Sequence, residues 1–432
     1  MKRKIIDELL EWKNREKNRM PLLLYGARQV GKTHILTEFG QRHYKNVAYV
    51  NLETNLAVSS YFAENIEPER ILRFLEAEVR AQIIPGETLV ILDEIQSCER
   101  ALTSLKYFNE KTPEYHIVCA GSLLGVAVNR ERYSFPVGNV ESMTLFPLDF
   151  EEFLWAQGET SLSAEIREAF AQNNPLPAAL HEKALDWYRV YLIVGGMPRA
   201  ILRYMQDGSV IPVPNVQNNI INDYIADMSK YADSAQSVKI RAAYHSLPVQ
   251  LAKENKKFQY KLAQKGGTAT IFGEAIDWLH FAGVVLKCSR IEQGTMPIAV
   301  YSDLSSFKLY MSDVGLLTLR SGVAQQIVLA AGETDNSFLG ALTENYVAQA
   351  FAAKQYGLYY WTSSGTAELD FVLQKGSEII PVEVKTGIRT KSRSLNVFVE
   401  KYKPAYAIRI SAKNFGFENN IKSVPLYAVF CI

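Results

Sequence analysis

The stretch that decides the fold is Gly26-Ala27-Arg28-Gln29-Val30-Gly31-Lys32-Thr33, which reads G-x-x-x-x-G-K-T, the phosphate-binding loop pattern. The apolar run Leu22 to Leu24 precedes it and predicts a buried strand. Neither Gly nor Pro occurs from Lys32 to Phe39, so a helix can begin there. The backbone N–H groups of such a turn, together with the N-terminus of the helix, favour a polyphosphate. The pattern therefore predicts nucleotide binding by residues 26 to 33 and by the adjoining His34.

The side chains at the end of the loop suggest ATP and Mg²⁺ as ligands. Lys32 is expected to reach the β- and γ-phosphates, and the Thr33 hydroxyl to bind Mg²⁺. Some sixty residues on, the run Leu89-Val90-Ile91-Leu92-Asp93-Glu94 has the Walker B pattern of a buried strand ending in two acids. Asp93 would bind Mg²⁺, and Glu94 would polarise the attacking water. The alternative is a strand whose terminal acids are simply solvated.

A third apolar run, Ile117 to Gly121, ends at Ser122 and predicts another core strand. Its polar tip would lie near the γ-phosphate, so Ser122 is a candidate nucleotide-binding residue. The alternative is that Ser122 only caps the following helix.

Composition excludes several other classes of protein. A chain of 432 residues has room for two to four domains. It has no apolar run near 18 residues, and residues 1–20 lack the apolar centre of a signal peptide, so no membrane partner is expected. The four cysteines are scattered without a C-x-x-C pair, which excludes a disulfide framework and suits the cytoplasm.

The middle of the chain suggests a DNA-binding module. Helices are expected over residues 240–247, 248–255 and 270–281, followed by a strand over 284–288, an order typical of a winged helix. Five lysines crowd this block against a single acid: Lys253, Lys256, Lys257, Lys261 and Lys265, with Glu254. A solvated helix face is the default interpretation of such a run of lysines, and contact with DNA is the alternative.

The C-terminal region contains two alternating runs, residues 367–373 and 379–385, with Lys375-Gly376 as a turn signal between them. An even loop that pairs Gln374 with Ser377 would set Asp370 opposite Pro381, and Glu368 opposite Glu383. One face would then be apolar, and the other would carry Glu368, Asp370, Glu383 and Lys385. Carboxylates this close repel each other unless a cation such as Mg²⁺ offsets them. The alternative is an amphipathic hairpin with a solvated charged face.

At this point the chain resembles a widespread prokaryotic family of AAA-type ATPases that carry a C-terminal restriction-endonuclease-like domain of unknown function. The matching stretches run nearly the whole length: residues 25–33, 92–96, 146–153, 195–198, 251–255 and 381–385. The fold class expected is α/β. The domains expected are a P-loop AAA-type core over 1–150, a helical lid over 151–230, the winged-helix-like block over 231–330, and the endonuclease-like domain over 331–432.

The resemblance also implies roles for particular residues. Arg199, after the Gly195–Pro198 turn, would be the lid arginine that senses the γ-phosphate, although a surface arginine fits the turn equally well. The pattern D…E-x-K resembles the nuclease signature, in which Asp370 and Glu383 hold Mg²⁺ with Glu344 as the upstream acid. Lys385 would orient the attacking water or stabilise the transition state. An oligomer is compatible with the resemblance.

Local charge points to a polyanion as partner. Residues 385–413 contain eight basic residues, Lys385, Arg389, Lys391, Arg393, Lys401, Lys403, Arg409 and Lys413, against Glu400 as the single acid. Two hypotheses follow. In the first, an ATPase acts on DNA and its nucleotide state gates a metal-dependent nuclease. In the second, the protein is a regulatory ATP switch whose inactive nuclease fold binds a partner.

Overall fold

The computed structural model describes residues 1–121, 136–230, 234–330, 337–363, 365–387 and 393–432. The chain forms two compact units. The first, here the N-terminal unit, comprises Arg3–Phe146 with Phe281–Gly283; the second, here the C-terminal unit, comprises Met1–Lys2, Pro147–His280 and Val284–Ile432. Within these ranges no helix combines the length and the apolar character needed to span a membrane.

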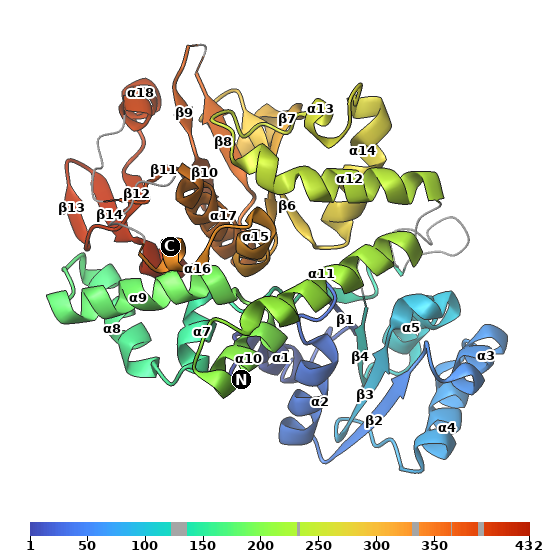
Figure 1. Ribbon diagram of the computed structural model, residues 1–432. Coiled ribbons are helices and arrows are strands. Elements are labelled where there is room, and N and C mark those ends of the chain that lie inside the picture. The colour runs from blue at the N-terminus through green and yellow to red at the C-terminus, as the bar shows by residue number, and fades with distance from the viewer. Residues whose placement is uncertain (122–135, 231–233, 331–336, 364, 388–392) are drawn as a thin grey trace. The chain divides into compact units, whose positions relative to one another are not determined.

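The N-terminal unit is built on a parallel sheet with strand order β2-β3-β4-β1-β5 (Figure 1). Its strands are β1 Leu22–Tyr25, β2 Asn46–Asn51, β3 Thr88–Asp93, β4 His116–Ala120 and β5 Glu141–Thr144. The helices are α1 Ile5–Lys13, α2 Lys32–His43, α3 Leu56–Glu64, α4 Pro68–Val79 and α5 Glu99–Lys111, with a short 3-10 helix η1 Ile95–Ser97. The strands predicted from the apolar runs that begin at Leu22, Leu89 and Ile117 are thereby confirmed.

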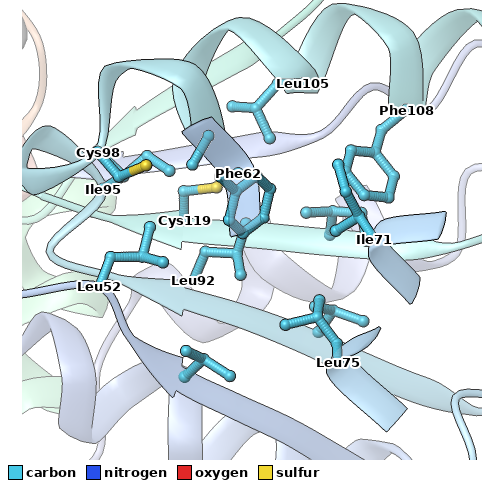
Figure 2. Packing of buried hydrophobic residues seen from close by; sticks show 14 of the residues in the cluster. Leu52, Phe62, Ile71, Leu75, Leu92, Ile95, Cys98, Leu105, Phe108 and Cys119 are labelled. Atoms are coloured by element: carbon cyan, nitrogen blue, oxygen red, sulfur yellow. The ribbon is translucent and has the colours of Figure 1, made fainter. Parts of the chain in front are cut away.

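Apolar side chains project from both faces of this sheet, and helices cover both faces. Leu92 and Cys119 pack with Phe62 of α3, Ile71 of α4 and Phe108 of α5 in one core cluster (Figure 2). On the opposite face Gly40 of α2 lies so close to Val47 and Leu89 that it has no room for a Cβ. This three-layer arrangement explains why Leu89 to Leu92 of β3 are apolar on both faces of the sheet.

The C-terminal unit begins with helices and ends with sheets. Its first helices are α7 Phe150–Ala156, α8 Thr160–Gln172, α9 Ala178–Val194, α10 Pro198–Asp207 and α11 Val213–Lys230. They are followed by α12 Ser234–Leu251, α13 Tyr260–Ala263 and α14 Ala269–Phe281, then by strands β6 Val285–Ile291 and β7 Ser302–Met311 with η3 Ile298–Tyr301 between them. The remaining helices are α15 Val314–Ser321, α16 Gln325–Leu329, α17 Ser337–Ala353 and α18 Arg393–Tyr402.

The expectation of separate helices over 240–247 and 248–255 is wrong. Residues 240–247 and the first half of 248–255 lie in the single helix α12, which contains Pro248 and ends at Leu251. A proline removes one N–H donor, but the following turn still closes because Ala252 N donates to Pro248 O at 3.1 Å. The order of α12, α13 and α14 before the antiparallel pair β6 and β7 agrees with the predicted winged helix, which stays a prediction.

One sheet of the C-terminal unit has the order β7-β6-β8-β9, with β8 Tyr359–Thr362 and β9 Glu368–Leu369. Strand β6 pairs with β8 in parallel, from Ser289–Tyr359 to Ile291–Trp361. The predicted boundary at residues 330 and 331 therefore lies between strands of one sheet.

A second sheet has the order β10-β11-β12-β14-β13. Its strands are β10 Phe371–Lys375, β11 Glu378–Val384, β12 Ala407–Ser411, β13 Gly416–Glu418 and β14 Ile421–Pro425, and η4 Leu426–Cys431 ends the chain. The last pair of β10 and β11 is Lys375 with Glu378, so the turn between them is Gly376-Ser377. Gly376 has a left-handed φ of +59°, a conformation that glycine adopts readily.

The predicted pairing of these strands is wrong by two residues. Lys375 pairs with Glu378, and Phe371 with Val382. Asp370 and Glu383 are the next residues beyond that last pair, so Asp370 does not face Pro381. Glu368 belongs to β9 of the other sheet, where it pairs with Thr362 instead of Glu383. A shift of two residues keeps every side chain on its predicted face, so the grouping of Asp370 with Glu383 survives.

Candidate nucleotide site and C-terminal carboxylate cluster

The loop that follows β1 has the backbone of a tight anion-binding turn. Gly26, Gln29 and Gly31 have positive φ values of +152°, +65° and +98°. A Cβ on Gly26 would collide with the carbonyl oxygen of Leu145, so only glycine fits at this position. Helix α2 begins directly at Lys32, and the N–H groups of its first turn suit an anion.

The Lys32 ammonium bends back over the loop. Its Nζ donates to the carbonyl oxygens of Gly26 at 2.9 Å and Ala27 at 3.0 Å. Phosphate oxygens are stronger acceptors for an ammonium than neutral carbonyls are. A bound polyphosphate would therefore take over these hydrogen bonds at the mouth of the loop.

Two oxygen groups from different elements meet beside this lysine. The Thr33 hydroxyl donates to Asp93 Oδ2 at 2.8 Å, which joins the start of α2 to the end of β3. Tyr49 of β2 donates to the same oxygen at 2.9 Å. Burial, with Asp93 next to it, raises the pKa of Tyr49, so Tyr49 stays a donor. Hydroxyl and carboxylate oxygens are the ligands Mg²⁺ prefers, so this pair fits the predicted role.

Glu94 lies at the end of β3 with a left-handed backbone, φ 51°. Its N–H donates to Asp93 Oδ1 at 3.0 Å, and its side-chain carboxylate accepts a hydrogen bond from Gln96 Nε2. Gln96 thus holds the carboxylate that was expected to polarise water. Gln96 lies in residues 92–96, one of the stretches that carry the family resemblance, but no role was predicted for it. Nothing in the sequence indicated a contact between Tyr49 and Asp93.

The remaining predicted nucleotide contacts are His34, Ser122 and Arg199. His34 is exposed on α2, and its Nε2 lies 3.4 Å from Glu38. Ser122 falls outside the residues that the structure describes. Arg199 lies exposed near the start of α10 in the C-terminal unit, so its role as a γ-phosphate sensor stays a prediction.

Residues 18–154, which contain the loop, β3 and the whole sheet, match the family described as an AAA domain. The N-terminal part of this chain is an AAA-type P-loop ATPase domain. Beyond the AAA domain, residues 185–326 and 339–429 match two domains of unknown function. A search among curated proteins gave no match.

Among solved structures, the chain is similar to a Walker-type ATPase of Pyrococcus abyssi, with 16% identity, a TM-score of 0.45, and coverage of 74% of this chain and 95% of that chain. AMPPCP-bound DnaA from Aquifex aeolicus has 15% identity and a TM-score of 0.27, covering 65% and 89%. Cdc6p from Pyrobaculum aerophilum has 10% identity and a TM-score of 0.26, covering 74% and 90%. The assignment of the AAA domain rests on the family match and on the geometry of the loop.

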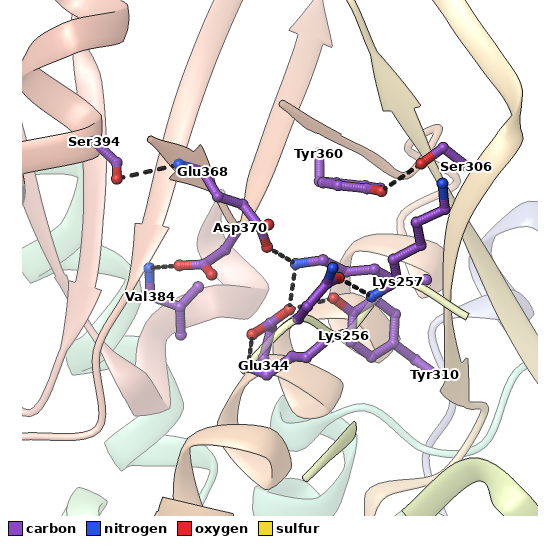
Figure 3. Close-up of polar contacts among 12 residues, drawn as sticks. Lys256, Lys257, Ser306, Tyr310, Glu344, Tyr360, Glu368, Asp370, Val384 and Ser394 are labelled. Carbon is purple, nitrogen blue, oxygen red and sulfur yellow. Dashed lines mark hydrogen bonds and ion pairs between the residues drawn. The ribbon is translucent and has the colours of Figure 1, made fainter. Parts of the chain in front are cut away.

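The second candidate site is a cluster of buried charges in the C-terminal unit. Glu344 of α17 is 2% exposed and contacts Lys256 (Figure 3). It also contacts Lys308, whose Nζ lies 3.1 Å from Glu344 Oε1. The Tyr310 hydroxyl donates to the same carboxylate. Burial alone would raise the pKa of Glu344, but Lys308 and Lys256 lower it to about 2, so Glu344 is ionised.

Asp370, Glu383 and Lys385 lie next to one another where β10 begins and β11 ends. Asp370 Oδ2 accepts from Val384 N at 2.8 Å, and Lys385 Nζ lies 2.6 Å from Glu383 Oε1. The second oxygen of Glu383, Oε2, is buried and has no hydrogen-bond partner within the described residues. Burial, with Glu344 and Glu383 nearby, raises the pKa of Asp370 to about 7.

These carboxylates do not fit the predicted three-acid Mg²⁺ site. Within the described ranges, no three side chains among His, Cys, Asp and Glu are grouped so that they could hold a metal ion. The predicted ligand Glu344 is instead taken up by Lys256, Lys308 and Tyr310. Sequence reasoning missed these three residues as partners, since they come from the segment after α12 and from β7 and meet Glu344 only through the fold.

Proposed function

We propose that this protein binds MgATP in the AAA domain and hydrolyses it. Lys32 binds the β- and γ-phosphates, Thr33 and Asp93 hold Mg²⁺, and Glu94, positioned by Gln96, activates the water. The observation that carries this proposal is the contact of Thr33 Oγ1 with Asp93 Oδ2 at 2.8 Å. It brings the two motifs together at one point, where Mg²⁺ would neutralise charge on the phosphates.

Lys32→Ala is expected to lose nucleotide binding, because it removes the ammonium that pairs with the phosphates. Loss of one partner of a charge pair costs about 2–5 kcal/mol, which raises Kd by roughly 30-fold to 4,000-fold. Calorimetric titration with MgATP measures this loss. Lys45→Ala is the control, since Lys45 follows α2 but pairs with Glu87 on the surface. Equal affinity of Lys32→Ala and Lys45→Ala for MgATP would remove Lys32 from the site.

We further infer that the C-terminal unit binds a polyanion such as DNA, and that the nucleotide state regulates this binding. Arg393, Lys401 and Lys403 are exposed on or directly after α18, and Lys413 is exposed after β12. Phosphate groups bind such surfaces through charge, with release of counterions. Arg389 and Lys391 of the same basic stretch lie outside the described residues.

Reversing Arg393, Lys401 and Lys403 to Glu is expected to weaken DNA binding strongly. For each phosphate group that the variant no longer binds, the slope of log K against log salt should also become shallower by about 0.9. Fluorescence anisotropy with labelled duplex and single-stranded DNA measures both effects. The matched control reverses Arg70, Arg73 and Lys106, exposed basic residues of the AAA domain. If both triple variants bind DNA with equal affinity, the basic residues on and directly after α18 do not form the DNA-binding surface.

A metal-dependent nuclease is the second candidate function. It is favoured by the adjacency of Asp370, Glu383 and Lys385 and by the unpartnered Oε2 of Glu383. In this candidate Asp370 and Glu383 hold the metal, and Lys385 orients water. Incubation of the protein with DNA, Mg²⁺ and ATP separates the two candidates. The regulatory switch leaves the DNA intact, and the nuclease shortens it unless Asp370 is replaced by Asn.

A further inference from the structure

The carboxylate cluster of the C-terminal unit has cations of its own. Lys308 of β7 is 1% exposed, and its Nζ lies 3.1 Å from Glu344 Oε1 and 2.7 Å from Glu368 Oε1. It also lies 4.8 Å from the ring centre of Tyr360, which adds a cation–π contact. A lysine this deeply buried is normally kept only by ion pairs, and here two carboxylates supply them.

Lys256 reaches the same carboxylate from another part of the chain. It lies between α12 and α13, contacts Glu344 Oε2, and keeps 19% of its side chain exposed. Figure 3 shows Lys256, Tyr310 and Glu344 gathered on one side of Asp370 and Glu368. One oxygen of Glu344 therefore pairs with Lys308 and the other with Lys256.

The charges of the cluster nearly balance without a metal. Four carboxylates, Glu344, Glu368, Asp370 and Glu383, face three ammonium groups, Lys256, Lys308 and Lys385. A divalent ion on Glu344 would have to displace at least one ammonium, since like charges repel strongly at this range. Such a displacement is easier at Lys256, which is partly exposed, than at the buried Lys308.

We propose that Lys308 and Lys256 are the resident cations of this carboxylate cluster, Lys308 fixed and Lys256 exchangeable, so that Lys256 excludes divalent metal from Glu344. The proposal concerns the C-terminal unit alone and does not depend on ATP hydrolysis. It predicts that Glu344 of the wild-type protein binds no divalent ion, and that removing the Lys256 ammonium turns Glu344 into a ligand for one.

Mn²⁺ titration followed by electron paramagnetic resonance tests this proposal in nucleotide-free Lys32→Ala protein, in which the AAA domain holds no MgATP. Lys256→Met added to this background is expected to raise Mn²⁺ affinity by about tenfold or more, the effect of removing one nearby positive charge. Lys253→Met is the control, because Lys253 is exposed on the same segment. Adding Glu344→Gln to Lys256→Met should abolish the gain.

Lys308→Met is titrated in parallel, with circular dichroism to verify folding. A gain in Lys256→Met that Glu344→Gln removes supports the proposal. It is overturned if the Lys32→Ala protein already binds Mn²⁺ and Glu344→Gln removes that binding. It is also overturned if Lys256→Met folds and gains no affinity over Lys253→Met. Lys256→Met with Lys32 intact is expected to bind MgATP normally. That result would support the proposed nucleotide binding whether or not the Mn²⁺ titration supports the role of Lys256.

Discussion

Glu94→Gln protein is expected to bind MgATP normally and to hydrolyse it about 10²–10⁴-fold more slowly than the wild type. The amide keeps the shape of the side chain at the end of β3 but cannot take a proton from water. Lys32, Thr33 and Asp93 are untouched, so phosphate and metal binding should persist. Single-turnover release of inorganic phosphate measures the rate, and calorimetry of the same variant measures binding.

The control for this prediction is Glu110→Gln, an exposed carboxylate of α5 in the same unit. Its hydrolysis rate should equal that of the wild type. Gln96→Ala should fall between the two, because Gln96 only positions Glu94 through its hydrogen bond. Wild-type turnover by Glu94→Gln would mean that another group activates the water and that the role given to β3 is incorrect.

Lys308→Met is expected to destabilise the C-terminal unit by about 3–5 kcal/mol, the usual cost of removing one partner of a buried ion pair. Glu344 would keep only Lys256 and Tyr310, and Glu368 would lose its ammonium at 2.7 Å. Hydrogen exchange of backbone amides in α17 and β7 measures the local free energy of opening, which separates this unit from the AAA domain.

Lys287→Met on the neighbouring strand β6 is the control. Its Nζ lies 3.8 Å from Asp277 near the surface, and such pairs contribute about 0–1 kcal/mol. The double variant Lys308→Met with Glu344→Gln should recover part of the stability, because Glu344 then no longer buries a charge that Lys256 alone must offset. A destabilisation no larger than that of Lys287→Met would show that Lys308 carries no structural charge.

The AAA domain could be predicted well from sequence because its signals are local. The loop, its following helix and the acids at the end of β3 each lie within a few consecutive residues, and backbone sterics fix glycine at Gly26. Tyr49 is different. It reaches Asp93 only because β2 and β3 are neighbours in the sheet. That strand order cannot be predicted from the residues of either strand.

The carboxylate cluster was predicted only in part, for a related reason. Alternation along a strand correctly placed Asp370 and Glu383 on one face. The predicted strand pairing was wrong because the turn was expected at Lys375-Gly376, whereas it is formed by Gly376-Ser377. The partners of Glu344 come from positions 256, 308 and 310, far away in sequence. Counting charges in one hairpin therefore suggested a metal where distant lysines already supply the positive charge.

The parallel pairing of β6 with β8 has a consequence for synthesis on the ribosome. Strands β6 and β7 emerge together and can pair at once, but the other edge of β6 awaits residues Tyr359–Thr362. Until then Ser289 to Ile291 present open backbone N–H and C=O groups to any passing strand. This strand edge of the nascent chain therefore stays unpaired until β8 has been made, and translational pausing before that point should lower the yield of folded protein.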